Sequence, residues 1–212
     1  FESKYADMQD WLSRCLEATE GKEYMDYAAF IQCIEAASKK LNIKLKKKNY
    51  DALDKYFSAT IESDNQELIV EVADYLIAHP DASVDMVRRA KFEKAKALEK
   101  SGKRNPAVAI YSALSEDVSN VEGAESAYRI IETAFKYGSF EKAESLVYEF
   151  ADKNTPHAFW LAKSFLLLGD VYLSRGDLFQ ARATYQSVVD GYSNKDDGII
   201  NEAIERVESL NN

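Results

Sequence analysis

The chain has 212 residues, which is long enough for one or two domains with a sizeable core. Its formal net charge of −9 disfavours general binding to nucleic-acid phosphates or anionic lipid headgroups, because an acidic surface repels both. No stretch approaches the roughly 20 apolar residues that a membrane span requires. There are only 8 Gly and 3 Pro, and strong helix formers such as Ala, Leu, Glu and Lys dominate most segments. We therefore expect an all-α protein.

The N-terminal region, residues 1–48, is expected to hold two amphipathic helices, at about 6–19 and 23–41. They form either degenerate repeats or a cap. Cys15 and Cys33 lie in these helices. They are expected as small buried residues, and a bridge between neighbouring helices is left open by their spacing.

A run of lysines follows, at positions 39, 40, 44, 46, 47 and 48. We interpret it as a solvated helix end, where Lys complements the partial negative charge of the C-terminus. The alternative is a patch for an anionic partner. Beyond it, residues 68–77 have helical periodicity and end at His79, and the preceding helix is expected at about 50–62.

A set of landmarks then recurs three times. A glycine stands five residues before an alanine, and a bulky residue stands four residues after that alanine. The three sets are Gly102, Ala107 and Tyr111; Gly138, Ala143 and Val147; and Gly176, Ala181 and Tyr185. The glycines are 36 and 38 residues apart. Each glycine is expected to end one helix with a positive φ, and each alanine to lie where two helices cross closely.

A third landmark is the small residue at the inner crossing, which is Ala95, Ile131 and Gly169 in turn. The isoleucine departs from the expected small size. Helix starts are expected at Asn105 and Thr155, which each precede a proline, and at Asp177, as N-caps.

The last helix is expected from about Gly198 to Leu210, as a cap on the final repeat. Its apolar face would carry Ile199, Ile200, Ala203, Ile204 and Val207.

The best-preserved repeat resembles the tetratricopeptide repeat. Phe165 is followed by Leu168, Gly169 and Tyr172 at the family's spacing, although the family has Trp in place of Phe165. The segment 152–182, with its Asn-Thr-Pro-His, Phe-Trp and Phe-Gln-Ala steps, resembles more specifically the C-terminal part of large tetratricopeptide-repeat proteins of Bacteroidetes-type bacteria. This resemblance covers roughly residues 50–200 and is strongest from 140 to 200.

The resemblance implies a right-handed superhelical solenoid of antiparallel helix pairs, with about ten or eleven helices. The expected organisation is an N-terminal region at 1–48, repeats at 49–196 and a capping helix at 197–212. The chain would be the C-terminal portion of a longer solenoid. The resemblance favours the bacterial periplasm or cell envelope, and the cytoplasm remains open.

In this family the first helix of each pair lines a concave groove that binds a partner. Helical spacing converts this rule into twelve candidate residues. They are Arg89, Phe92, Lys96 and Glu99; Glu125, Tyr128, Glu132 and Phe135; and Lys163, Leu166, Asp170 and Leu173. The alternative is that these are ordinary exposed helix residues, or that more of the solenoid covers them. The set lacks the Lys/Asn/Arg arrangement with which some members clamp a terminal carboxylate.

The sequence has few residues or motifs that are typical of catalytic or metal-binding sites. The two histidines, His79 and His157, lie at expected helix boundaries in different repeats, and we expect structural roles for both. There is no Gly-rich phosphate loop, CxxC pair or HExxH motif. The Phe159-Trp160 pair is expected to fill the space between adjacent repeats rather than to bind a partner. We therefore expect no enzyme activity, no cofactor and no metal.

Three functions are compatible with this description. The first is a scaffold that binds a protein or peptide. The second is a structural subunit whose repeats stack on further repeats or on a second copy. The third is an RNA-binding helical repeat, which the acidic balance disfavours.

Overall fold

A computed structural model describes residues 54, 57–58, 60–79 and 82–210 of the chain. Within these ranges the regular structure is entirely α-helical, which confirms the predicted class. The helices expected at 6–19 and 23–41, both cysteines and the lysine run lie outside the described residues.

The chain divides into two compact units between Gly102 and Lys103. This division falls inside the range 49–196, which we expected to be a single run of repeats. We describe each unit by itself.

In the described part of the first unit, α4 (Gln66–Ala78) and α5 (Val84–Lys100) pack as an antiparallel pair. Residues 60–62 end a preceding helix. Polar side chains cap both helices, because Asn65 accepts a hydrogen bond from the Leu68 amide at 3.2 Å and Ser83 accepts one from the Met86 amide at 3.2 Å. The helix predicted at 68–77 is therefore confirmed as α4.

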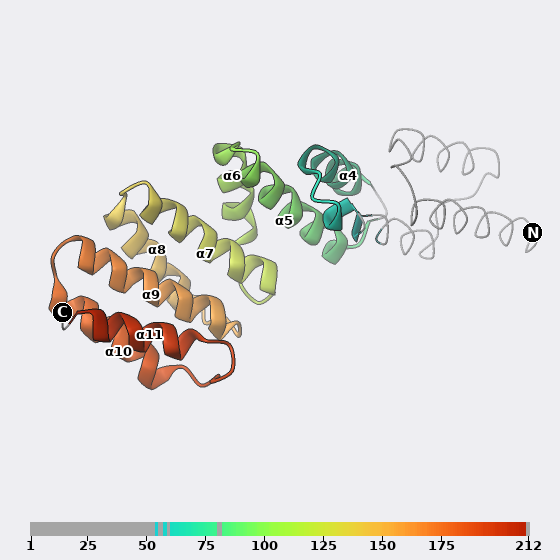
Figure 1. Ribbon diagram of the computed structural model, residues 1–212. Helices are drawn as coiled ribbons and strands as arrows, with labels where there is room; N and C mark the ends of the chain where they lie inside the picture. The colour runs from blue at the N-terminus through green and yellow to red at the C-terminus, as the bar shows by residue number, and fades with distance from the viewer. Residues whose placement is uncertain (1–53, 55–56, 59, 80–81, 211–212) are drawn as a thin grey trace, which may run out of the picture. The chain divides into compact units, whose positions relative to one another are not determined.

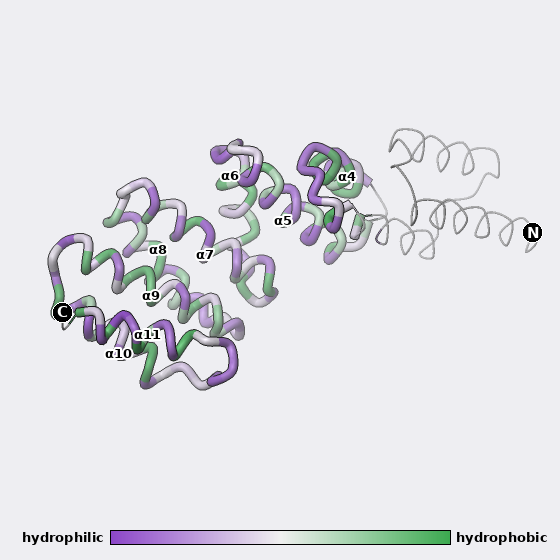
Figure 2. Tube along the Cα trace, in the orientation of Figure 1, coloured by the Kyte–Doolittle hydropathy of each residue, from purple (hydrophilic) through white to green (hydrophobic). Residues whose placement is uncertain are grey.

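The second unit contains six helices in chain order. They are α6 (Arg104–Leu114), α7 (Val121–Lys136), α8 (Phe140–Asp152), α9 (Ala158–Ser174), α10 (Leu178–Gly191) and α11 (Ile199–Ser209). Consecutive helices pack on one another, and α9 also packs on α7 and α11. Figure 1 shows α7, α9 and α11 side by side, with α8 and α10 behind them. In Figure 2, hydrophilic and hydrophobic segments alternate along α7, as expected for a helix with one face in the core.

The three landmark glycines end helices as predicted. Gly102, Gly138 and Gly176 have φ values of 75°, 71° and 80°. A side chain in this left-handed region clashes with the following carbonyl, whereas glycine has no such penalty.

We expect Gly176→Ala to lower the free energy of unfolding by about 1 kcal/mol, because alanine is strained at this φ. Space does not oppose the change, since a Cβ at Gly176 would meet nothing within 4 Å. Urea denaturation measures the effect. Gly176→Asn is the matched control, and it should be less destabilising because asparagine tolerates positive φ. Equal losses for both variants would contradict backbone strain as the cause.

The alanines predicted at helix crossings are buried, and a close crossing is shown for the pair α9 and α10. Ala107, Ala143 and Ala181 are at most 1% exposed. A Cβ on Gly169 would lie 2.2 Å from the ring of Tyr185, so α9 and α10 approach closely at this point. Ile131 is fully buried in the same apolar cluster as Val147. Because Val147 stands at the repeat position of Tyr185, its smaller side chain offsets the bulk of the isoleucine.

Two predicted N-caps are wrong. Asn105 lies inside the first turn of α6, whose N-cap is Lys103. Thr155 precedes the N-cap of α9, which is His157. The Thr155 hydroxyl instead donates to the carbonyl of Val118 at 2.7 Å and accepts from the His157 amide at 3.1 Å, so it joins two loops. Asp177 does cap α10, by accepting from the Gln180 amide at 3.0 Å.

The C-terminal helix matches α11, with one correction. Ile199 and Ala203 are buried, but Ile204 is 38% exposed and does not belong to the packed face. The reason is that α11 packs mainly on α10 and α9 within the described part of the chain, which leaves its outer side free.

Candidate functional site

The surface carried by α7, α9 and α11 contains six of the twelve residues predicted to bind a partner. We call it the α7–α9–α11 face. It comprises Glu125, Tyr128, Arg129, Glu132, Phe135, Lys136, Phe159, Trp160, Lys163, Asp170, Glu202 and Arg206.

Aromatic rings and one cation meet at the centre of this face. Tyr128 and Trp160 have ring centroids 5.4 Å apart, and Phe159 meets Trp160 edge-on at 5.0 Å. The ammonium of Lys163 lies 5.4 Å from the ring centroid of Tyr128 and 5.8 Å from that of Phe159. Trp160 also packs against the core formed with α7 and α8, and Phe159 packs against the core formed by α9, α10 and α11. Both side chains remain partly exposed.

Two clusters of ion pairs flank the aromatic group. On α7, Arg129 lies 2.9 Å from Glu125 and 3.8 Å from Glu132, and Lys136 lies 3.0 Å from Glu132. By contrast, Lys163 makes no ion pair with a carboxylate among the residues that the structure describes. Its positive charge is balanced only by the faces of aromatic rings, a weaker interaction.

The second cluster joins α9, α10 and α11 at Asp170. This carboxylate accepts a hydrogen bond from the Tyr185 hydroxyl at 2.6 Å and another from Arg206 at 3.2 Å. Arg206 also lies 2.6 Å from Glu202. Burial, reinforced by the hydrogen bond to Asp170, raises the pKa of Tyr185 well above its usual value. The phenol therefore stays protonated and acts as a fixed donor.

Several predicted groove residues are not available to a partner. Leu166, Tyr128 and Phe92 are 1%, 7% and 6% exposed, so the expectation that their side chains face solvent is wrong. Leu166 is buried because α9 packs on α7, α8, α10 and α11, which leaves little of its circumference free.

Other candidates are engaged within the chain. Asp170 belongs to the cluster described above. In the first unit, Arg89 lies 2.6 Å from Asp54 and donates to Ser58 at 2.9 Å, while Lys96 pairs with Glu93 at 3.0 Å. Glu99 is partly exposed, as are Glu125, Glu132, Phe135 and Lys163, and Leu173 is 40% exposed. The four candidates on α5 belong to the first unit and the other eight to the second.

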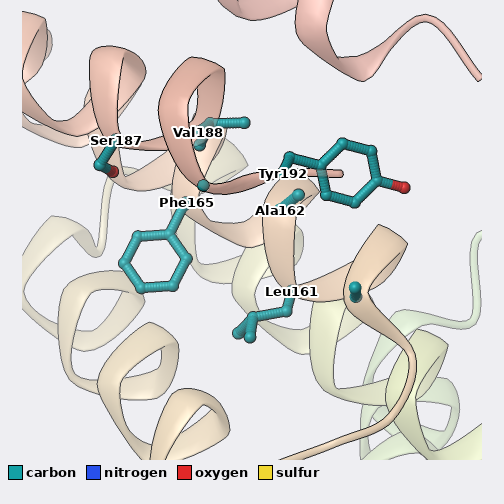
Figure 3. Close-up of a pocket in the computed structure, with 8 residues that line it drawn as sticks. Leu161, Ala162, Phe165, Ser187, Val188 and Tyr192 are labelled. Atoms are coloured by element: carbon teal, nitrogen blue, oxygen red, sulfur yellow. The ribbon is translucent and has the colours of Figure 1, made fainter. Parts of the chain in front are cut away.

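The structure also contains two hollows that the sequence did not predict, and none of the twelve candidates lines either one. The smaller hollow, of about 280 Å³, lies between α9 and α10 and is mostly apolar. Figure 3 shows Leu161, Ala162 and Phe165 of α9 around it, with Ser187, Val188 and Tyr192 from the end of α10.

The larger hollow, of about 610 Å³, lies between α6, α7 and the start of α8, and we call it the α6–α8 groove. Its lining residues are Arg104, Asn105, Val108, Ala109, Ser112, Ile130, Thr133, Ala134, Tyr137, Ser139, Lys142 and Leu146. Small side chains on α6 and α7, among them Ala109, Ser112 and Ala134, leave space in this hollow. A comparison of the repeats position by position could have found it, because the next repeat has tyrosines at the positions of Ser112 and Ala134.

The described ranges hold no candidate metal-binding cluster and no membrane-spanning helix. They contain no group of three or more His, Cys, Asp or Glu side chains placed to hold a metal ion. None of their helices is long and apolar enough to cross a membrane. His157 makes a structural contact, with its ring nitrogen 3.2 Å from the carbonyl of Ser119.

Comparison of the chain with protein-family models, curated proteins and solved structures found no match.

Proposed function

We propose that this chain is a non-catalytic scaffold of tetratricopeptide-like repeats that binds a protein or peptide along the α7–α9–α11 face. The packing order supports the repeat architecture. α9 packs on both helices of the preceding pair, α7 and α8, and α11 packs on both helices of the pair α9 and α10. Stacked helical repeats have this pattern, in which each repeat contacts its neighbours. In a right-handed solenoid the α7–α9–α11 face would be concave.

The observation that carries the binding proposal is the environment of Lys163. This partly exposed cation lies over two aromatic rings and has no carboxylate in ion-pair distance within the described ranges. Phe159 and Trp160 beside it are partly exposed, and rigid aromatic side chains lose little entropy on binding. A carboxylate from a partner would give Lys163 the ion pair that the other cations of this face already have.

The alternative is a structural subunit that stacks on further repeats or on a second copy. Apolar side chains at the turn between α9 and α10 favour it. Leu173, Leu178 and Phe179 are 40%, 54% and 79% exposed, and large apolar side chains gathered on a surface often mark an interaction site.

Site-specific photo-crosslinking in the source cell tests both readings. A photoreactive phenylalanine analogue at position 163 or 136 should crosslink to the same partner protein, because both positions are accessible on the α7–α9–α11 face. The same analogue at Glu149 or Gln186, which are exposed on α8 and α10, should not capture that partner.

Two outcomes would contradict the scaffold proposal. Crosslinks from positions 163 and 136 only to other copies of the chain would favour the structural subunit. Equal capture of one protein from all four positions would show that the face has no selectivity. Circular dichroism of each variant checks that its helices are retained.

A further inference from the structure

The α6–α8 groove lies on the other side of α7 from the proposed binding face. Successive residues of a helix are rotated by roughly 100°, so Ala134 and Tyr137 project roughly opposite to Glu132 and Tyr128. A ligand in this groove would therefore leave the α7–α9–α11 face free.

The groove has a positive charge that nothing in its lining balances. Arg104 and Lys142 line it, and no Asp or Glu does. Neither cation makes an ion pair with a carboxylate among the described residues. The Arg104 guanidinium instead lies 3.4 Å from the ring centroid of Tyr137, which is 63% exposed. In a chain with a net charge of −9, such a surface is complementary to acidic groups.

The next repeat shows what fills an equivalent groove. The glycines that precede α6 and α8 are 36 residues apart, so Ser112 of α6 corresponds to Tyr148 of α8. The glycines that follow α7 and α9 are 38 residues apart, so Ala134 of α7 corresponds to Tyr172 of α9. The two tyrosine hydroxyls are hydrogen-bonded at 2.9 Å. Two phenol rings thus occupy the positions at which the α6–α8 groove has a hydroxymethyl and a methyl group.

The next repeat also supplies a carboxylate. Val108 of the groove corresponds to Glu144. Glu144 accepts a hydrogen bond from Tyr172 at 2.8 Å and from Arg175 at 2.5 Å. The hydrogen bond from Arg175 lowers the pKa of this carboxyl. In this repeat the carboxylate of Glu144 is therefore hydrogen-bonded to both Tyr172 and Arg175 of the same chain.

We propose that the α6–α8 groove binds a segment of a partner protein that presents an aromatic side chain beside a carboxylate. The aromatic ring would take the space that Tyr172 and Tyr148 fill in the next repeat. The carboxylate would pair with Arg104 and Lys142. This site is separate from the α7–α9–α11 face and does not depend on the function proposed for it.

Fluorescence anisotropy with a labelled peptide of four Tyr-Glu repeats tests the proposal. We expect saturable binding, with affinity reduced about tenfold or more in Arg104→Glu/Lys142→Glu, because two charge pairs become repulsive. Ser112→Tyr should also weaken binding, since it fills the groove without changing the charge. Lys195→Glu, which reverses the charge of an exposed loop cation, should bind as the unmodified chain does.

Three results would overturn the proposal. The first is no saturable binding of the Tyr-Glu peptide. The second is equal affinity in the groove variants and the unmodified chain, with circular dichroism showing that all are folded. The third is equal affinity for peptides of Tyr-Glu and Ala-Glu repeats, which would show that charge attraction alone accounts for binding and that the groove does not bind the aromatic ring.

Discussion

Replacement of Leu166 by glutamate should unfold the second unit or leave it only marginally stable. Leu166 is 1% exposed and packs with Ala181, Tyr185 and Ile199 in the cluster that joins α9, α10 and α11. The change removes a buried apolar side chain and places a carboxylate where no cation of that cluster can pair with it. We expect a loss of about 4 kcal/mol or more, against the roughly 5–15 kcal/mol that stabilises a typical domain.

Thermal and urea denaturation followed by circular dichroism would measure this loss. Leu173→Glu is the matched control, because it makes the same chemical change on the same helix at a side chain that is 40% exposed. We expect that control to lie within about 0.5 kcal/mol of the unmodified chain. A Leu166→Glu protein as stable as Leu173→Glu would contradict the assignment of Leu166 to the core.

Gly123→Ala should be the most disruptive of the glycine substitutions. A Cβ at this position would lie 1.9 Å from the carbonyl oxygen of Asp117 and 2.9 Å from that of Leu114, and both are backbone atoms. The loop cannot move aside cheaply, since Asn120 donates to the Asp117 carbonyl at 3.0 Å and accepts from the Gly123 amide at 2.9 Å.

Two opposing effects decide the sign of this change. Alanine in a helix is favoured over glycine by about 1 kcal/mol. Overpacking against fixed atoms costs about 1–3 kcal/mol and occasionally more. A clash with backbone is at the upper end of that range, so we expect a net loss of about 2 kcal/mol in urea denaturation.

Gly191→Ala is the control for this prediction. It lies at the end of α10, and a Cβ there would meet nothing within 4 Å, so the substitution should be neutral or slightly stabilising. If Gly123→Ala and Gly191→Ala gave the same stability, close contact with the α6–α7 loop could not be the reason for glycine at position 123.

Local chemistry made much of the fold predictable. The turn at Gly138 needs only a positive φ, and the cap at Asp177 needs only a neighbouring amide, so short stretches of sequence specify both. Thr155 was assigned wrongly because its hydroxyl bonds a carbonyl 37 residues away, at Val118. Gly123 was missed for a similar reason, since the atoms that exclude a side chain there belong to a loop.

The candidate site was harder to predict. The spacing rule assumed that α9 has one buried face, yet three consecutive leucines at 166–168 cannot lie on a single face of a helix. That run was a signal for burial on several sides. The α6–α8 groove depends on small residues such as Ser112 and Ala134. The space that they leave becomes evident only when they are compared with Tyr148 and Tyr172, the corresponding residues of the next repeat.

The position of α9 has a consequence for how the second unit opens. In a linear array each repeat interacts only with its nearest neighbours, so terminal repeats can fray while the rest stays folded. Here α9 packs on four of the other five helices of its unit. α9 therefore lies inside the stack, with a helix pair or a helix on either side of it, and not at an end that can fray. We expect slow exchange of its amide hydrogens.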